Sequence, residues 1–148
     1  MHRNEHTVEI DAPAAAVFPY LVDSAQRLRW MGALKESEPL NGGPPGAGAR
    51  WRDVFEDHGH RIELEAEVDE YEPVERLRIR LRAGGFEATS EQRLEEASGR
   101  SRLTTVIETD YKSLAARLMA GVVTRHAQKQ LEADHATLKE LVEREAVV

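Results

Sequence analysis

Hydrophobic and polar positions alternate with a period of two from about residue 49 to residue 111. Turn residues interrupt this alternation at His58-Gly59, Glu72-Pro73, Gly84-Gly85 and Ser98-Gly99. Such alternation is typical of strands that have one buried and one exposed face. The pattern therefore predicts five consecutive antiparallel strands. We expect a further strand within residues 33–40 and an N-terminal strand over residues 6–10.

The last third of the chain has helical rather than strand periodicity. Residues 113–145 contain no Pro and a single Gly, and their apolar residues recur at helical spacing: Leu114, Leu118, Val122, Leu131, Leu138 and Val142. This pattern predicts one long amphipathic helix, with Gly121 as the point where it could bend. Two short helices are expected earlier, one capped by Asp11 and one capped by Ser24 and ended by Gly32.

The charges of two neighbouring strands predict how these strands pair. Acidic residues alternate over residues 63–69 and Arg residues alternate over residues 76–82. A hairpin at Pro73 is expected to place Glu67 opposite Arg78 and Glu65 opposite Arg80, because opposite charges across antiparallel strands are mildly favourable. The other three turns then predict a consistent set of inward pairs, which includes Trp51 with Ala66, Asp53 with Leu64, Ile79 with Ser90, Leu81 with Ala88, Gln92 with Thr105 and Phe86 with Tyr111.

The inner face predicted in this way carries polar side chains among apolar ones, namely Asp53, Ser90, Gln92, Thr105 and Thr109. Burying a polar group without a partner costs on the order of 1–3 kcal/mol. One interpretation is a cavity between sheet and helix where these groups meet a ligand or water. The other is that they lie half-exposed at the sheet ends or bond to the helix backbone.

Composition narrows the class of protein. The chain has 148 residues, which fits a single domain over 1–148, and it has no Cys, which excludes disulfides and thiolate chemistry. No apolar run is long enough for a membrane span, so we expect a cytoplasmic protein without stable membrane insertion. The net charge of −7, with acidic residues facing the Arg row, argues against nucleic-acid binding.

The candidates for acid–base chemistry are Asp53, Tyr111 and His126, and each also has a structural interpretation. The carboxylate could pair with an Arg, the phenol could pack, and the imidazole could bond to a neighbour. His135 shares the apolar side of its helix, which favours core packing or an edge hydrogen bond. The remaining His residues, including His58 and His60, do not form a zinc ligand set, so we expect neither a metal nor a cofactor.

Several segments together resemble a known family. They are the opening Val8–Asp23 with its Ala-Pro-x-x-x-Val-x-x-x-Leu-x-Asp motif, Trp30, Gly46–Trp51, Arg100–Val106 and the helix over Leu131–Glu143. In this order they are similar to the START-related (SRPBCC) superfamily, whose helix-grip fold is shared by pollen-allergen-like proteins, lipid-transfer domains and bacterial polyketide cyclases/dehydrases. The resemblance covers nearly the whole chain, and it carries over no catalytic residue.

The resemblance implies an α+β fold, in which a curved antiparallel sheet of about seven strands wraps on the long C-terminal helix. Two short helices are expected between the first and second strands. It also implies a hydrophobic cavity between sheet and helix, with Met31 near its entrance and Leu114 and Met119 on its helix side. The residues expected to line this cavity are Trp30, Trp51, Asp53, Phe55, Leu64, Ile79, Leu81, Ala88, Ser90, Gln92, Thr105, Ile107, Thr109, Leu118, Val122 and His126.

Three functions fit these expectations. The first is binding of a small hydrophobic molecule of lipid, polyketide or aromatic type. The second is a polyketide cyclase or dehydratase with acid–base residues in the cavity, and the third is a protein-interaction module that uses the charged sheet face or the helix. The expected assembly is a monomer or a homodimer.

Overall fold

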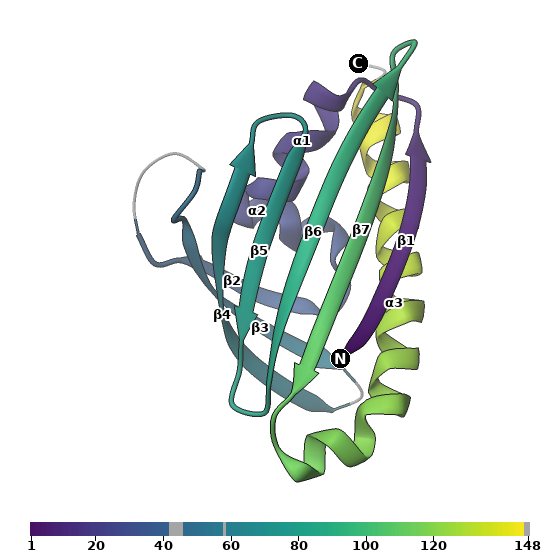
Figure 1. Cartoon of the computed structure of the whole chain (residues 1–148). Helices are drawn as coiled ribbons and strands as arrows, with labels where there is room; N and C mark the ends of the chain where they lie inside the picture. Colours follow the sequence, from purple (N-terminus) through teal and green to yellow (C-terminus); the bar gives the residue numbers. More distant parts are fainter. Residues whose placement is uncertain (42–45, 58, 147–148) are drawn as a thin grey trace.

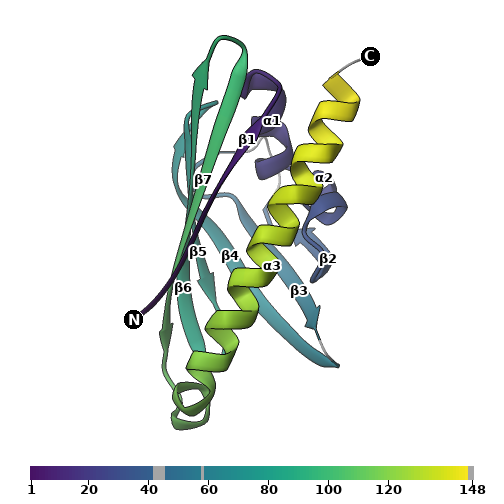
Figure 2. The ribbon, with the colours of Figure 1, turned by 90° about the vertical axis from the view of Figure 1, so that its right-hand side faces the viewer.

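The computed structural model describes residues 1–41, 46–57 and 59–146. A seven-stranded antiparallel sheet curves over one side of a long C-terminal helix, and two short helices close one end (Figure 1, Figure 2). The strand order is β1-β7-β6-β5-β4-β3-β2. The elements are β1 (His2–Ile10), α1 (Ala14–Val22), α2 (Ser24–Trp30), β2 (Leu34–Pro39), β3 (Arg50–Asp57), β4 (His60–Glu72), β5 (Arg76–Arg82), β6 (Phe86–Ala97), β7 (Arg100–Tyr111) and α3 (Leu114–Ala146). The helix-grip architecture is therefore confirmed.

Three of the predicted hairpin registers are confirmed. The inward pairs between β3 and β4, between β5 and β6, and between β6 and β7 are those that the alternation predicts. Because side chains alternate strictly across a strand, this agreement also fixes which residues face α3. His58, part of one predicted turn, lies outside the described residues.

The register predicted between β4 and β5 is wrong by two residues. Glu67 pairs with Arg80 rather than with Arg78, and Glu65 pairs with Arg82. The turn is tighter than expected, with Val74 in the left-handed region at φ 73°. A β-bulge at Asp69 adds one residue to β4, and the charged face remains on the outer side.

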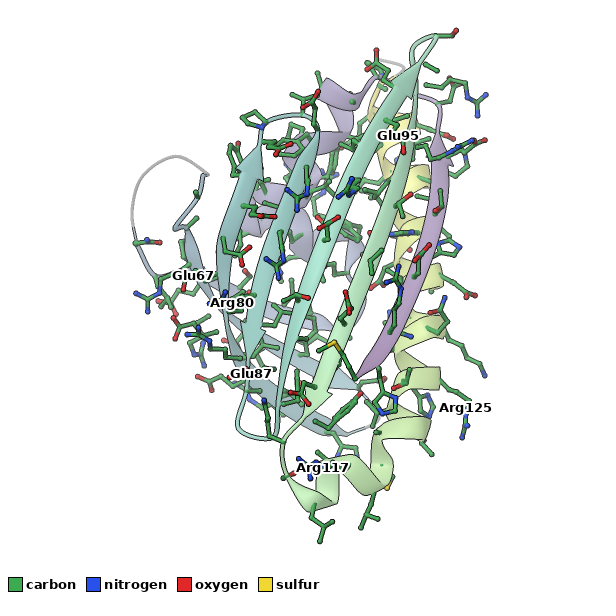
Figure 3. The ribbon with its side chains drawn as sticks, viewed as in Figure 1. Glu67, Arg80, Glu87, Glu95, Arg117 and Arg125 are labelled. Carbon is green, nitrogen blue, oxygen red and sulfur yellow. The ribbon has the colours of Figure 1, made fainter. Side chains whose placement is uncertain are left out.

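The outer face of the sheet carries a series of ion pairs between strands. Figure 3 shows Glu67, Arg80 and Glu87 on the side of the sheet turned away from α3. The Asp69 carboxylate lies 3.4 Å from Arg78 and 3.5 Å from Arg80, because the bulge places it between the two side chains. The Arg row of β5 is thus accompanied by acidic residues, as the sequence predicts.

Both predicted helix caps need correction. Pro13 rather than Asp11 is the N-cap of α1, and the Asp11 backbone N–H instead donates to the Glu143 carboxylate at 2.7 Å. The N-cap of α2 is Asp23, whose side chain accepts from the backbone N–H groups of Ala25 and Gln26. Ser24 is the first residue inside the helix.

The buried apolar side chains of α3 lie mainly in its second half. Leu131, Leu138 and Val142 are buried, whereas the side chains of Leu118 and Val122 are 77% and 41% exposed. The first turns of the helix extend past the end of the sheet (Figure 1). The prediction that Leu114, Leu118, Met119, Val122 and His126 face the sheet is therefore wrong.

Candidate functional site

A cavity of about 220 Å³ lies between the inner face of the sheet, the end of α2 and the middle of α3. The sheet contributes alternate residues of β5, β6 and β7 that point inward, and α3 contributes residues from Ala127 to His135. The lining consists of Arg27, Trp30, Met31, Ala33, Phe55, Ile79, Leu81, Ser90, Gln92, Thr105, Ile107, Ala127, Gln130, Leu131, Asp134 and His135. An apolar wall with a few convergent polar groups is typical of small-molecule sites.

The structure brings together half of the residues that the sequence assigns to this lining. Those on the cavity wall are Trp30, Phe55, Ile79, Leu81, Ser90, Gln92, Thr105 and Ile107. Those buried on the inner face away from the cavity wall are Trp51, Asp53, Leu64, Ala88 and Thr109. Leu118 and Val122 lie on the exposed part of α3, and His126 lines a surface hollow there instead.

The helix side of the cavity differs from the prediction, which places an earlier stretch of α3, between Leu114 and His126, on the cavity wall. Ala127, Leu131, Asp134 and His135 follow each other at spacings of four, three and one, which places them on one helix face. The predicted position of His135 on the apolar side of its helix is confirmed, and this position is the signal in the sequence that indicates the helix face lining the cavity. Arg27 and Gln130, also on the wall, carry no comparable signal in the sequence.

His135 is held on both sides of its ring. Its Nδ1 lies 2.8 Å from His6 Nδ1, and its Nε2 lies 2.9 Å from Thr105 Oγ1. Burial, with a smaller contribution from the neighbouring His6, lowers the pKa of His135 to about 4. The imidazole is therefore neutral near pH 7, and both of its nitrogens are engaged, so it fixes the wall rather than exchanging protons.

Asp134 is the acidic group of the cavity wall. Its Oδ1 accepts from the Gly32 backbone N–H at 2.9 Å and from Gln130 Nε2 at 2.7 Å. Burial raises the pKa of this carboxyl, and the two hydrogen bonds oppose the rise only in part. A carboxyl group of raised pKa on a cavity wall can act as a general acid.

Asp53 is an ion-pair residue rather than a free carboxylate. Arg27 of α2 binds it in a bidentate manner, with Nη2 to Oδ2 at 2.7 Å and Nη1 to Oδ1 at 3.2 Å. Ser37 Oγ donates to the same Oδ1 at 2.7 Å, and the guanidinium lies 4.9 Å from the centre of the Trp51 ring. Both charged side chains are almost fully buried. The pair therefore joins α2 to the sheet and places Arg27 at the cavity wall.

Gln92 provides a buried acceptor that none of the described residues satisfies. Its Oε1 is buried on the inner face of β6 and has no hydrogen-bond partner among the described residues. Leaving such an oxygen unpaired costs on the order of 1–3 kcal/mol. A ligand with a hydroxyl or N–H donor would remove this cost.

The three acid–base candidates of the sequence do not meet. Asp53 is paired with Arg27, Tyr111 packs near Phe86 and His2, and His126 lies on the outer side of α3. Over residues 1–41, 46–57 and 59–146 the structure has no cluster of three or more side chains able to hold a metal ion. None of the helices in this part of the chain is both long and apolar enough to cross a membrane.

Both the sequence and the fold of this chain are similar to those of known proteins. The family model described as polyketide cyclase/dehydrase and lipid transport matches residues 1–143. The structure of TTHA0849 from Thermus thermophilus is similar with a TM-score of 0.81 and 18% identity, over 95% of this chain and 97% of that one. The Zhui aromatase/cyclase from Streptomyces sp. R1128 is similar with a TM-score of 0.80 and 20% identity, over 97% and 94%. Among curated proteins no relative was found.

Proposed function

Because the chain belongs to the polyketide cyclase/dehydrase and lipid transport family, we propose that it binds a small hydrophobic ligand in the cavity between the sheet and α3. The observation that carries the proposal is the combination of apolar walls with Gln92 Oε1, which has no partner in the part of the chain that the structure describes. Apolar surface gives such a ligand its affinity, and the few polar groups select its orientation.

The size of the cavity favours a compact ligand. An apolar cavity of about 150 Å³ accommodates one benzene ring. The volume of about 220 Å³ therefore suits one ring or a small fused pair, within the aromatic and polyketide classes rather than a long lipid chain. A hydroxyl on that ring would donate to Gln92 Oε1.

Titration with 1-naphthol, followed by fluorescence, tests this proposal. We expect saturable binding by the wild-type protein and loss of binding in Ala127→Phe, because the larger side chain fills the cavity from α3. Ala133→Phe is the matched control, since Ala133 is an exposed residue of the same helix and does not line the cavity. Equal affinity in the wild type and in Ala127→Phe would refute the proposal, provided that both variants give the circular dichroism of the wild type.

A second function, that of a cyclase or dehydratase, is favoured by one observation. Asp134 reaches the cavity wall with a carboxyl whose pKa is raised by burial. A carboxylic acid can donate its proton to a ketone oxygen as an enol carbon of the same chain attacks the ketone carbon, and the carboxylate takes up the proton that the enol oxygen releases as its own carbonyl re-forms.

Turnover of a short poly-β-ketone substrate distinguishes the enzyme from the binding protein. Asp134→Asn is expected to keep the affinity for 1-naphthol and to abolish conversion, whereas Glu132→Gln, an exposed change on the same helix, should preserve both. If the wild type binds 1-naphthol but converts no such substrate, binding alone is its function.

A further inference from the structure

The exposed half of α3 combines apolar and basic side chains on one face. Leu118, Val122, Arg125 and Lys129 are spaced by four, three and four residues, so they form a stripe along the helix. We call this stripe the α3 outer face. All four side chains are exposed, and Figure 3 shows Arg125 pointing away from the sheet.

Leu114 extends the α3 outer face toward the start of the helix, and further exposed apolar residues lie on the adjoining side of the helix. The side chains of Leu114 and Met119 are 73% and 53% exposed, and Val123 is exposed as well. Between residues 112 and 130, Ala120 is the only buried residue of the helix. This concentration of exposed apolar surface at one end of the molecule is typical of a surface that binds another protein or a membrane.

The charge of this segment is opposite to that of the whole chain. No acidic residue occurs between Asp110 and Glu132, whereas Lys112, Arg117, Arg125 and Lys129 are all basic and the net charge of the chain is −7. Within the part of the chain that the structure describes, neither Arg125 nor Lys129 has an ion-pair partner. The Arg residues 76, 78 and 80 of the sheet face do have such partners.

The same face contains a shallow hollow. Val122, Arg125, His126 and Lys129 line a depression of about 170 Å³. An apolar residue at one side and basic side chains around the rest suit an anionic headgroup beside its hydrocarbon chain.

We propose that the α3 outer face docks this protein on anionic lipid bilayers. A second copy of the chain fits less well, because a two-fold symmetric contact would bring this basic face against itself. A nucleic acid would use the basic side chains but would leave the protruding Leu114 and Leu118 without a partner. A bilayer satisfies both, with phosphate headgroups for the cations and the upper acyl region for the apolar side chains.

The position of the α3 outer face also relates it to the cavity. Ala127, Gln130 and Leu131 reach the cavity wall from the same stretch of α3 that carries Arg125 and Lys129 on its other side. Docking would therefore bring the cavity within one helix diameter, about 10 Å, of the bilayer, where hydrophobic compounds partition. This link rests on the proposed function, whereas the docking itself does not.

Co-sedimentation of the full chain with lipid vesicles tests the proposal. We expect binding to vesicles of equal parts phosphatidylcholine and phosphatidylglycerol, weak binding to phosphatidylcholine alone, and a decrease in high salt. Each basic side chain near an anionic surface contributes on the order of fivefold in affinity. Arg125→Glu/Lys129→Glu should therefore lower the affinity more than about tenfold, and Leu118→Ser/Val122→Ser should also weaken binding.

The control variant is Arg100→Glu/Arg144→Glu. It makes the same change in net charge at the end of the molecule that holds the β6–β7 turn and the last turns of α3, away from the start of α3 (Figure 1). We expect it to bind as the wild type does. An equal loss in both variants would overturn the proposal, as would absence of binding to the anionic vesicles. Light scattering that shows a dimer dissociated by Leu118→Ser/Val122→Ser would assign the face to a second copy instead.

Discussion

The Nδ1 atoms of His6 and His135 lie 2.8 Å apart, and this contact joins the edge strand β1 to the buried side of α3. One ring must donate and the other accept, and Thr105 completes the arrangement at the opposite nitrogen of His135. The arrangement needs no charge on His135, whose pKa is about 4 in the folded protein.

His135 is expected to make stability depend on pH. Its folded pKa of about 4 lies below the ordinary value of 6.5, so between these values the unfolded chain binds more protons. The neutral His135 therefore contributes about 3 kcal/mol to the free energy of unfolding above pH 6.5, and this contribution is lost as the pH falls toward 4. Urea denaturation over this range should therefore show a steeper pH dependence for the wild type than for His135→Gln.

The wild type must be compared with a variant that lacks His135, because Asp134 beside it also has a shifted pKa. The raised pKa of Asp134 has the opposite sign, because stability is lost as the pH rises through it. The difference between wild type and His135→Gln removes this shared contribution. Thr105→Val keeps the imidazole and should retain the pH dependence despite losing about 1 kcal/mol. Identical slopes for wild type and His135→Gln would contradict the assignment.

The Arg27–Asp53 pair is expected to dominate the stability of the α2 contact. In Asp53→Asn the guanidinium remains buried without its counter-charge, so we expect a loss of about 3–5 kcal/mol in the free energy of unfolding. The matched control is Glu63→Gln in the exposed pair with Arg52, whose N–O distance of 2.6 Å is just as short. Exposed pairs contribute less than about 1 kcal/mol. Similar losses in the two variants, measured by chemical denaturation, would disprove the difference.

The inward and outward faces of the strands could be predicted from the sequence because side chains alternate with a period of two, and because Gly or Pro residues indicate the turns. Trp51, Asp53 and Gln92 are buried on the inner face as the alternation requires. The register around Asp69 differs from the prediction because the prediction assumes one unbroken alternation along β4, whereas the acidic residues change from odd to even positions at Asp69 and Glu70, where the bulge lies. The tight turn with Val74 at positive φ also lacks the Gly that normally indicates such a conformation.

The cavity was predictable on its sheet side and not on its helix side. Helical periodicity identifies an apolar stripe along α3 but does not tell which turns the sheet covers, so Leu118 and His135 were equally eligible. Which of them is covered depends on where α3 starts relative to β7. The sequence also does not predict which Arg pairs with Asp53, because the pair with Arg27 depends on how α2 packs on the sheet.

Two glycines are expected to respond in opposite ways to alanine. A Cβ at Gly32 would lie 3.0 Å from Gln130 Nε2 and 3.4 Å from Asp134 Oδ1. Gly32→Ala should displace the Gln130 amide and cost about 1 kcal/mol through the weakened hydrogen bond to Asp134. Gly121→Ala, in a helix with open space around it, should stabilise the protein by about 0.5–1 kcal/mol. Thermal denaturation decides the sign, and a gain in Gly32→Ala would show that the contact is loose.

The variant Gln92→Leu tests two effects of this side chain separately, one on the stability of the ligand-free protein and one on the affinity for a ligand. The Gln92 Oε1 is buried without a partner among the described residues, so a leucine of similar size should raise the free energy of unfolding by about 1 kcal/mol. The same change removes the acceptor for a ligand hydroxyl, and the affinity for 1-naphthol should fall by about fivefold. Naphthalene is the matched control, because it has no hydroxyl and should bind both proteins equally. If Gln92→Leu lost stability and bound both compounds like the wild type, the oxygen would be satisfied within the protein and would play no part in selecting a ligand.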